Sequence, residues 1–266
     1  MFSSKSIRGK WTWAFVDLLV VIIGVYIAFL IQSSAAAEKD KKEQEKVFTA
    51  LKFELEHFRL QMPGMSGYVN SEVEKYMATI KSGDYSNFTD WRFIQPQYSY
   101  QIIEYAISIQ NTEIINFELY DALQKLFVEI KKLEHAESLI METSMRYQTI
   151  PEGLPKTDPL YQMTWANNYD NFGRFITFMN DRARVLQAIA DASQATLPII
   201  NEKLGEEKTR EIEKQFILSN ASKVKNEDQA VALVKRIFPD FTEEEVRELY
   251  RQASQTKTTP ADSPGQ

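Results

Sequence analysis

The chain has 266 residues, of which 44% are hydrophobic and 26% are charged, and its formal net charge is −6. This composition is typical of a folded globular protein and not of a disordered chain. The acidic balance argues against nucleic acid as a partner, because phosphate binding needs a basic surface. The sequence has no cysteine, which excludes disulfides, thiolate zinc sites and thiol nucleophiles.

The N-terminal segment contains the strongest pattern. Residues 14–31 are apolar with a single charge, Asp17. A helix of about 20 such residues crosses the roughly 30 Å hydrocarbon layer of a bilayer. The sequence therefore predicts a transmembrane helix at 14–34 that binds the lipid bilayer. Trp11 and Trp13 precede it, and we expect both to be membrane-interface anchors, because amphipathic rings suit the headgroup region.

The charges around this segment predict its orientation. The short tail, 1–13, carries Lys5, Arg8 and Lys10 and no acid. By the positive-inside rule the N-terminus stays cytoplasmic, and the bulk of the chain is translocated across the membrane after a single pass. A cleaved signal peptide with a site at Ala35–Ala37 is the alternative. The apolar run is longer than the ~7–15 residues of such peptides, which favours a retained anchor.

Asp17 has two interpretations. A carboxylate at the bilayer centre costs on the order of 2.5–3.5 kcal/mol, so an intramembrane acid is a functional candidate for carrying protons or pairing with a partner. A span shifted to residues 18–37 instead places Asp17 at the interface, in the first helical turn, where the helix dipole favours an anion. The second interpretation is the favoured one.

The charged stretch from Glu38 is predicted to continue the same helix as a stalk. Val47, Leu51, Leu55, Phe58 and Met62 recur at helical spacing and form one apolar stripe. Pro63-Gly64 is predicted to end this helix, and a second, shorter one is expected over 69–80.

Two longer helices are predicted further along. One starts near Asn116, with a stripe of Leu119, Leu123, Leu126, Ile130, Leu133 and Ile140. The other covers about 162–204, where Pro198 is expected to kink or divide it. Gly205 marks a break before a weaker helix that ends near Leu218.

A compact helical pair is predicted at 223–254. Asn226 and Thr242 stand at helix-start positions, and Thr242 with Glu245 forms a capping-box pattern. Val231, Val234, Ile237, Phe238, Phe241, Val246 and Leu249 are its expected core. The tail, 255–266, is predicted to be disordered. The resulting fold class is all-α: an N-terminal transmembrane helix continues into a stalk helix and an antiparallel helical bundle over 35–222.

The segment 16–59 resembles a bacterial family known as domain of unknown function 6090. The matching positions are Asp17, Ile23–Val25, Ile27–Phe29, Leu51 and Glu54-Leu55, and the stretch 114–127 is similar to a second patch of that family. The chain departs from the family pattern at Gln32–Ser34, and in having aspartate instead of glutamate at 17. The resemblance implies a single-pass bacterial membrane protein with a helical extracytoplasmic part, and it brings no catalytic residues.

A second, shorter resemblance concerns the basic tail and the apolar run after Asp17. They look like the single span of proton-driven stator and energy-transduction subunits, in which one aspartate near the start of the span handles protons. The resemblance implies that role for Asp17. The soluble parts of those proteins are α/β, whereas this sequence predicts an all-α domain.

The remaining patterns predict neither catalysis nor a cofactor. Glu54 and His57 form a Glu-x-x-His motif, as in di-iron bundles, but a second motif is missing around His135, so no metal site is expected. An aromatic segment, comprising Tyr161, Trp165, Tyr169 and Phe172, is either a partner or ligand surface or part of a packed core, and packing is favoured. We expect a non-enzymatic scaffold or protein-interaction module, which self-associates or binds a protein partner; a stator-like proton-coupled subunit and a ligand-sensing domain are the alternatives.

Overall fold

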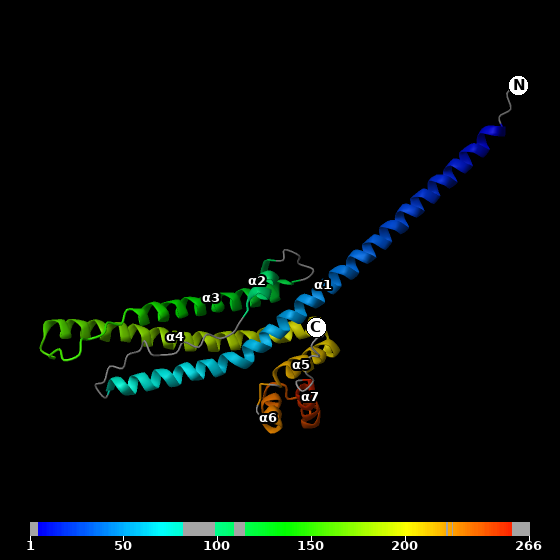
Figure 1. Cartoon of the computed structure of the whole chain (residues 1–266). Coiled ribbons are helices and arrows are strands. Elements are labelled where there is room, and N and C mark those ends of the chain that lie inside the picture. Colours follow the sequence, from blue (N-terminus) through cyan, green and yellow to red (C-terminus); the bar gives the residue numbers. More distant parts are fainter. Residues whose placement is uncertain (1–4, 82–98, 109–114, 222, 225, 257–266) are drawn as a thin grey trace, which may run out of the picture. The chain divides into compact units, whose positions relative to one another are not determined.

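The computed structural model describes residues 5–81, 99–108, 115–221, 223–224 and 226–256, with side chains described from Glu38 onward except at 40, 79 and 80. Within these ranges the regular elements are all helices and no strand occurs, which confirms the all-α fold class (Figure 1). The helices are α1 (Lys5–Lys81), α2 (Gln101–Ser108), α3 (Phe117–Met145), α4 (Pro159–Leu204), α5 (Glu206–Ala221), α6 (Glu227–Ile237) and α7 (Glu243–Thr256).

The chain divides into two compact units, 1–47 and 48–266. The predicted span at 14–34 belongs to the first unit, and it lies outside the residues whose side chains are described, as do Trp11, Trp13 and Asp17. Over the described part of the chain, no helix combines the length and the apolar character needed to cross a membrane. The described end of this unit is highly charged and includes an exposed ion pair of 2.7 Å between Lys42 and Glu38.

In the second unit, α4 runs antiparallel to both α1 and α3 (Figure 1). Lys52 and Ser66 of α1 bond to Asn201 and to the carbonyl oxygen of Ala183, so rising numbers on α1 meet falling numbers on α4. Glu137 of α3 reaches Arg182 of α4, and Gln148 just after α3 reaches Asn168. The predicted antiparallel arrangement is therefore confirmed for these long helices.

The predicted helix end at Pro63 is wrong, because α1 continues through it to Lys81. A proline inside a helix removes one backbone hydrogen bond. Here Pro63 and Gly64 are on the exposed side, while Met62, Ser66 and Val69 are buried around them. The Ser66 hydroxyl also donates to the Ala183 carbonyl at 2.8 Å. Packing of the inner face thus keeps the helix intact despite the missing bond.

Pro198 likewise does not divide α4, which extends from Pro159 to Leu204. Its exposed ring lies between the buried residues Leu197 and Ile200. The predicted break at Gly205 is confirmed: this glycine has φ +79° and ψ 164°, a conformation that other residues avoid.

The apolar stripe of α1 is used inside the chain. Leu51, Leu55, Phe58 and Met62 are each no more than 1% exposed. These four side chains are therefore packed within the chain. The stripe of α3 is buried in the same way, and Asn116 caps this helix by accepting a hydrogen bond of 3.0 Å from the Leu119 amide, as predicted.

Helices α5–α7, residues 206–256, are called the C-terminal module below. The predicted helix starts are confirmed: Asn226 accepts from the Gln229 amide, and Thr242 and Glu245 exchange two backbone-to-side-chain bonds of 2.8 and 3.2 Å. The expected core is confirmed too, with Ile237 partly buried and Val231, Val234, Phe238, Phe241, Val246 and Leu249 buried beside Phe216 and Ile217 of α5. This cluster fixes α5 to the helical pair.

Candidate interaction surface

The structure divides the predicted aromatic segment into an inner and an outer part. Phe172 is 5% exposed, and its ring lies 6.1 Å from that of Tyr76 on α1. Trp165 and Tyr169 are one helical turn apart on α4 and stack with ring centres 5.7 Å apart. Tyr169 is 52% exposed, whereas Tyr161 and Trp165 are partly buried. Packing thus explains Phe172, and Tyr169 belongs to the surface.

An open groove runs beside these outer rings. Tyr169, Phe172, Gly173 and Ile176 of α4 line it, with Met77 of α1 on its other side. Gly173 is exposed, and a Cβ there would meet no atom within 4 Å, so the missing side chain adds to the hollow. Neither Tyr161 nor Trp165 is among the lining residues. The groove is a shallow surface feature and not an enclosed ligand cavity.

The end of the α3–α4 hairpin carries exposed apolar side chains that the sequence analysis did not single out. We call Met141, Met145, Leu160 and Met163 the hairpin surface; their side chains are 46%, 76%, 48% and 58% exposed. Flexible, polarizable methionines are over-used at surfaces that bind several apolar partners. The available signal was the position of Met141 and Met145 off the buried stripe of α3.

Two side chains hold the backbone of this hairpin. Asn168, 5% exposed, accepts from the Gln148 amide at 3.0 Å and donates to the Gln148 carbonyl at 2.8 Å. Asp158 caps α4 by accepting from the Leu160 amide at 2.7 Å, with Pro159 at the first helical position. The surface therefore stands on an ordered loop, and Asn168 is a positioning residue that its sequence context did not reveal.

The Glu-x-x-His motif does not converge on a site. Glu54 accepts a hydrogen bond of 3.0 Å from the Ser99 amide, while His57 packs against the rings of Phe53 and Phe216. Burial raises the pKa of Glu54, and burial together with Lys223 lowers the pKa of His57. Among the described residues no group of histidine and carboxylate side chains is arranged to hold a metal ion.

A buried cluster of charges lies where α1 meets α4 and α5. The Lys52 ammonium is 2.9 Å from Glu213, 2.8 Å from Asn201 and 3.4 Å from Glu56. Arg59 is 2.5 Å from the second oxygen of Glu56. Burial raises the pKa of the Glu56 carboxyl, and the nearby cations of Arg59 and Lys52 act against that effect. The charges neutralise one another, so the cluster is a structural junction.

Comparison of the chain with protein-family models, with curated proteins and with solved structures gave no match. The resemblance of 16–59 to domain of unknown function 6090 therefore stays a prediction. The hairpin surface and the apolar run at 14–31 are the two features on which a functional proposal can rest.

Proposed function

We propose that the protein is a membrane-anchored helical scaffold that binds a protein partner. In this proposal residues 14–34 span a bacterial inner membrane once, and the helical unit 48–266 lies on the periplasmic side. The observation that supports a membrane anchor is the apolar run 14–31, which contains a single charge at Asp17. The basic residues of the tail support the orientation.

The hairpin surface supports the partner-binding role. Four large apolar side chains stay 46–76% exposed at one end of the hairpin, whereas the apolar stripes between α3 and α4 are buried and the exposed Phe117, Val128 and Tyr169 lie elsewhere along the two helices. Exposed apolar groups that gather in one place mark interaction sites more often than scattered ones do. The proposed partner presents an apolar helix face, because exposed methionines adapt to such surfaces with little loss of packing.

The anchor is tested by placing two arginines in the apolar run, at Ile23 and Ile27. Each arginine at the centre of a span costs about 2.5–3.5 kcal/mol. We expect the full chain to stay with membranes after alkaline extraction and the Ile23→Arg/Ile27→Arg variant to become extractable. The matched control places the two arginines outside the run, at Glu43 and Gln44, and should stay bound. An extractable wild-type chain contradicts the anchor.

The interaction surface is tested in the membrane-bound full chain by crosslinking to neighbouring proteins. Met145→Glu/Met163→Glu introduces two charges on the hairpin surface and should abolish a crosslinked product seen with the wild type. Lys125→Glu, on an exposed and already charged part of α3, is the control and should keep that product. A product that survives in the double variant, or a chain without any crosslinked partner, contradicts the proposal.

A further inference from the structure

The C-terminal module has a hydrophobic core of its own. Its eight buried core residues all belong to residues 216–249. Arg210 of α5 pairs with Glu245 of α7 at 2.7 Å and lies over the ring of Phe241 at 4.3 Å. Arg247 of α7 pairs with Glu227 of α6 at 3.3 Å. The three helices are thus tied to one another by apolar and ionic contacts, as a unit that moves together would be.

The attachment of this module to α1 is of a different kind. Lys52, which is fully buried, bridges Glu56 of its own helix, Asn201 of α4 and Glu213 of α5. Arg59 extends the cluster and lies over the ring of Phe238 at 5.0 Å. Buried charges stabilise an interface much less than apolar packing of the same size, because they must first be taken out of water. The junction therefore depends on orientation-dependent bonds beside the partly buried contacts of Phe53, His57 and Leu60.

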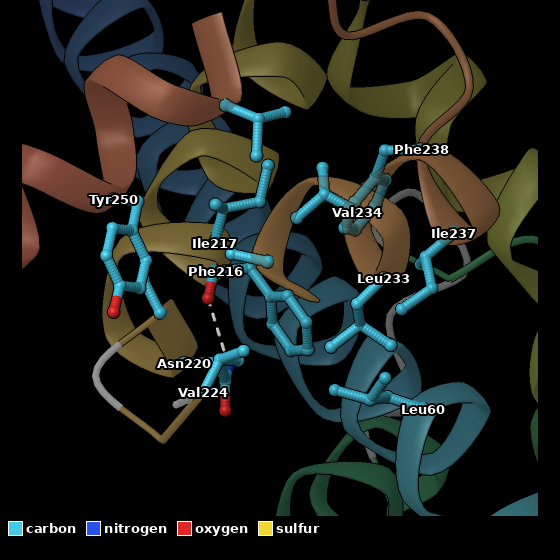
Figure 2. A pocket seen from close by; sticks show the side chains of 13 residues that line it. Leu60, Phe216, Ile217, Asn220, Val224, Leu233, Val234, Ile237, Phe238 and Tyr250 are labelled. Carbon is cyan, nitrogen blue, oxygen red and sulfur yellow. Dashed lines mark hydrogen bonds between the residues drawn. The ribbon is translucent and has the colours of Figure 1, made fainter. Parts of the chain in front are cut away.

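The apolar part of the junction is incompletely filled. A cavity of about 30 Å³ lies within the module where it meets α1; residues of α5, α6 and α7 line it, and Leu60 is its one lining residue from α1. Figure 2 shows Leu60 facing Leu233 and Ile237 across this space. Such a volume holds about one water molecule, and an apolar lining gives water too few partners. Contacts are therefore missing between Leu60 and the module at this place.

A single residue joins the module to the bundle. Gly205 separates the end of α4 at Leu204 from the start of α5 at Glu206. Its φ of +79° and ψ of 164° belong to a region that is essentially restricted to glycine. Hinges are formed by a few residues at the ends of helices that absorb large backbone rotations. A glycine between two helices meets that requirement.

We propose that the C-terminal module opens as one body about Gly205, and that the Lys52 cluster is the latch that holds it closed on α1. Opening uncovers Phe53, His57 and Leu60, which lie on one face of α1 and contact the module in the closed state. This inference is independent of the partner-binding proposal, because it concerns the opposite part of the unit and needs no partner.

The absence of native cysteine allows a direct test in the full chain. The single thiol of a Leu60→Cys variant is partly buried in the closed state, so it reacts with a labelling reagent slowly while the module is closed and faster while the module is open. A single thiol at Leu126, buried in the middle of α3, reports global unfolding instead. We expect the thiol at 60 to be labelled about tenfold or more faster than the thiol at 126 under native conditions, because sub-global opening costs less than unfolding.

Variants of the latch and of the cavity should change the labelling rate of the thiol at 60 in opposite directions. Lys52→Met should accelerate labelling at 60 about tenfold or more, because Glu56 and Glu213 lose their shared cation and the closed state is destabilised. As a control, Lys214→Met removes an exposed lysine of α5, next to Glu213, and should change neither labelling rate. Val234→Ile adds one methylene next to the cavity and should slow labelling at 60 several-fold.

The result that overturns the proposal is equally defined. If the thiols at 60 and 126 react at the same rate in every variant, the module opens only by global unfolding. If Lys52→Met accelerates neither thiol, the cluster is not a latch. Should Lys52→Met fail to fold, Glu213→Gln removes one negative charge of the latch at a site that is 17% exposed, and Val234→Ile tests the junction from the stabilising side.

Discussion

The α3–α4 hairpin and the C-terminal module are both helical, yet they are held in different ways. α3 meets α4 along two buried apolar stripes, crossed by one buried ion pair between Glu137 and Arg182. The buried core of the module comes from its own three helices, and the module meets α1 through a charged cluster and the partly buried side chains of Phe53, His57 and Leu60. One helical unit can therefore be held together by two kinds of contact. Apolar burial stabilises with little dependence on orientation, whereas buried charges need a fixed geometry.

The largest expected effect concerns the ion pair that crosses the hairpin. Arg182 is fully buried, with its Nε 3.0 Å from Glu137. Arg182→Met leaves a buried carboxylate without this cation and should reduce the free energy of unfolding by about 3–5 kcal/mol. Arg182→Met/Glu137→Leu should restore most of the loss, because the apolar pair needs no desolvation. Urea unfolding of the three chains measures both values, and equal stability of the single and double variants would contradict this account.

Two glycines sharpen the comparison between the regions. Gly205 has φ +79°, so Gly205→Ala forces a side chain into a conformation that costs about 1–3 kcal/mol. Gly173 lies inside α4 with ordinary backbone and open space around it, so Gly173→Ala should raise stability by about 0.5–1 kcal/mol. Thermal unfolding of the two variants compares them directly. If both substitutions changed the stability in the same direction, the backbone conformation of Gly205 would not govern the connection between α4 and α5.

A smaller effect is expected at the start of α7. Thr242→Ala removes a capping bond and should reduce the free energy of unfolding by about 1 kcal/mol.

The hydrogen bond from the Thr242 amide, followed by the bond from Arg210, lowers the pKa of Glu245 to about 2. The stabilisation by Glu245 is thus complete above its usual value of 4.5 and is lost as the pH falls from 4.5 through about 2. Helicity measured across this range should decline less steeply in Glu245→Gln.

The smallest expected effect is a pH dependence at the junction of the module with α1. Burial first, and Lys223 second, lower the pKa of His57 below its usual value of 6.5. The unfolded chain therefore binds a proton at this residue more readily than the folded one. Stability is complete above pH 6.5 and declines as the pH falls through the lowered value. His57→Phe should remove this part of the pH profile of unfolding, and an unchanged profile would show that the histidine is solvated.

The sequence predicted the helical class, the helix starts at Asn116, Asn226 and Thr242, and the inner stripe of α3. These features are local, because caps act over three residues and stripes repeat every three to four. A helix end at Pro63 was predicted wrongly, because the rule that proline ends helices takes no account of the packing of Met62 and Val69 around it. The aromatic segment was predicted to pack, with a partner or ligand surface as the alternative, and only the tertiary structure separates the buried Phe172, beside Tyr76, from the exposed Tyr169.

Composition and spacing alone thus determined that the chain folds into helices, which faces those helices bury and where the apolar run at 14–31 lies. Only the tertiary structure decided that Lys52 and Arg182 are buried, that α1 passes Pro63 unbroken, and that Met145 and Met163 stay exposed. The physical reason is distance along the chain. Lys52 is buried by partners at Asn201 and Glu213, and no local pattern around residue 52 contains them.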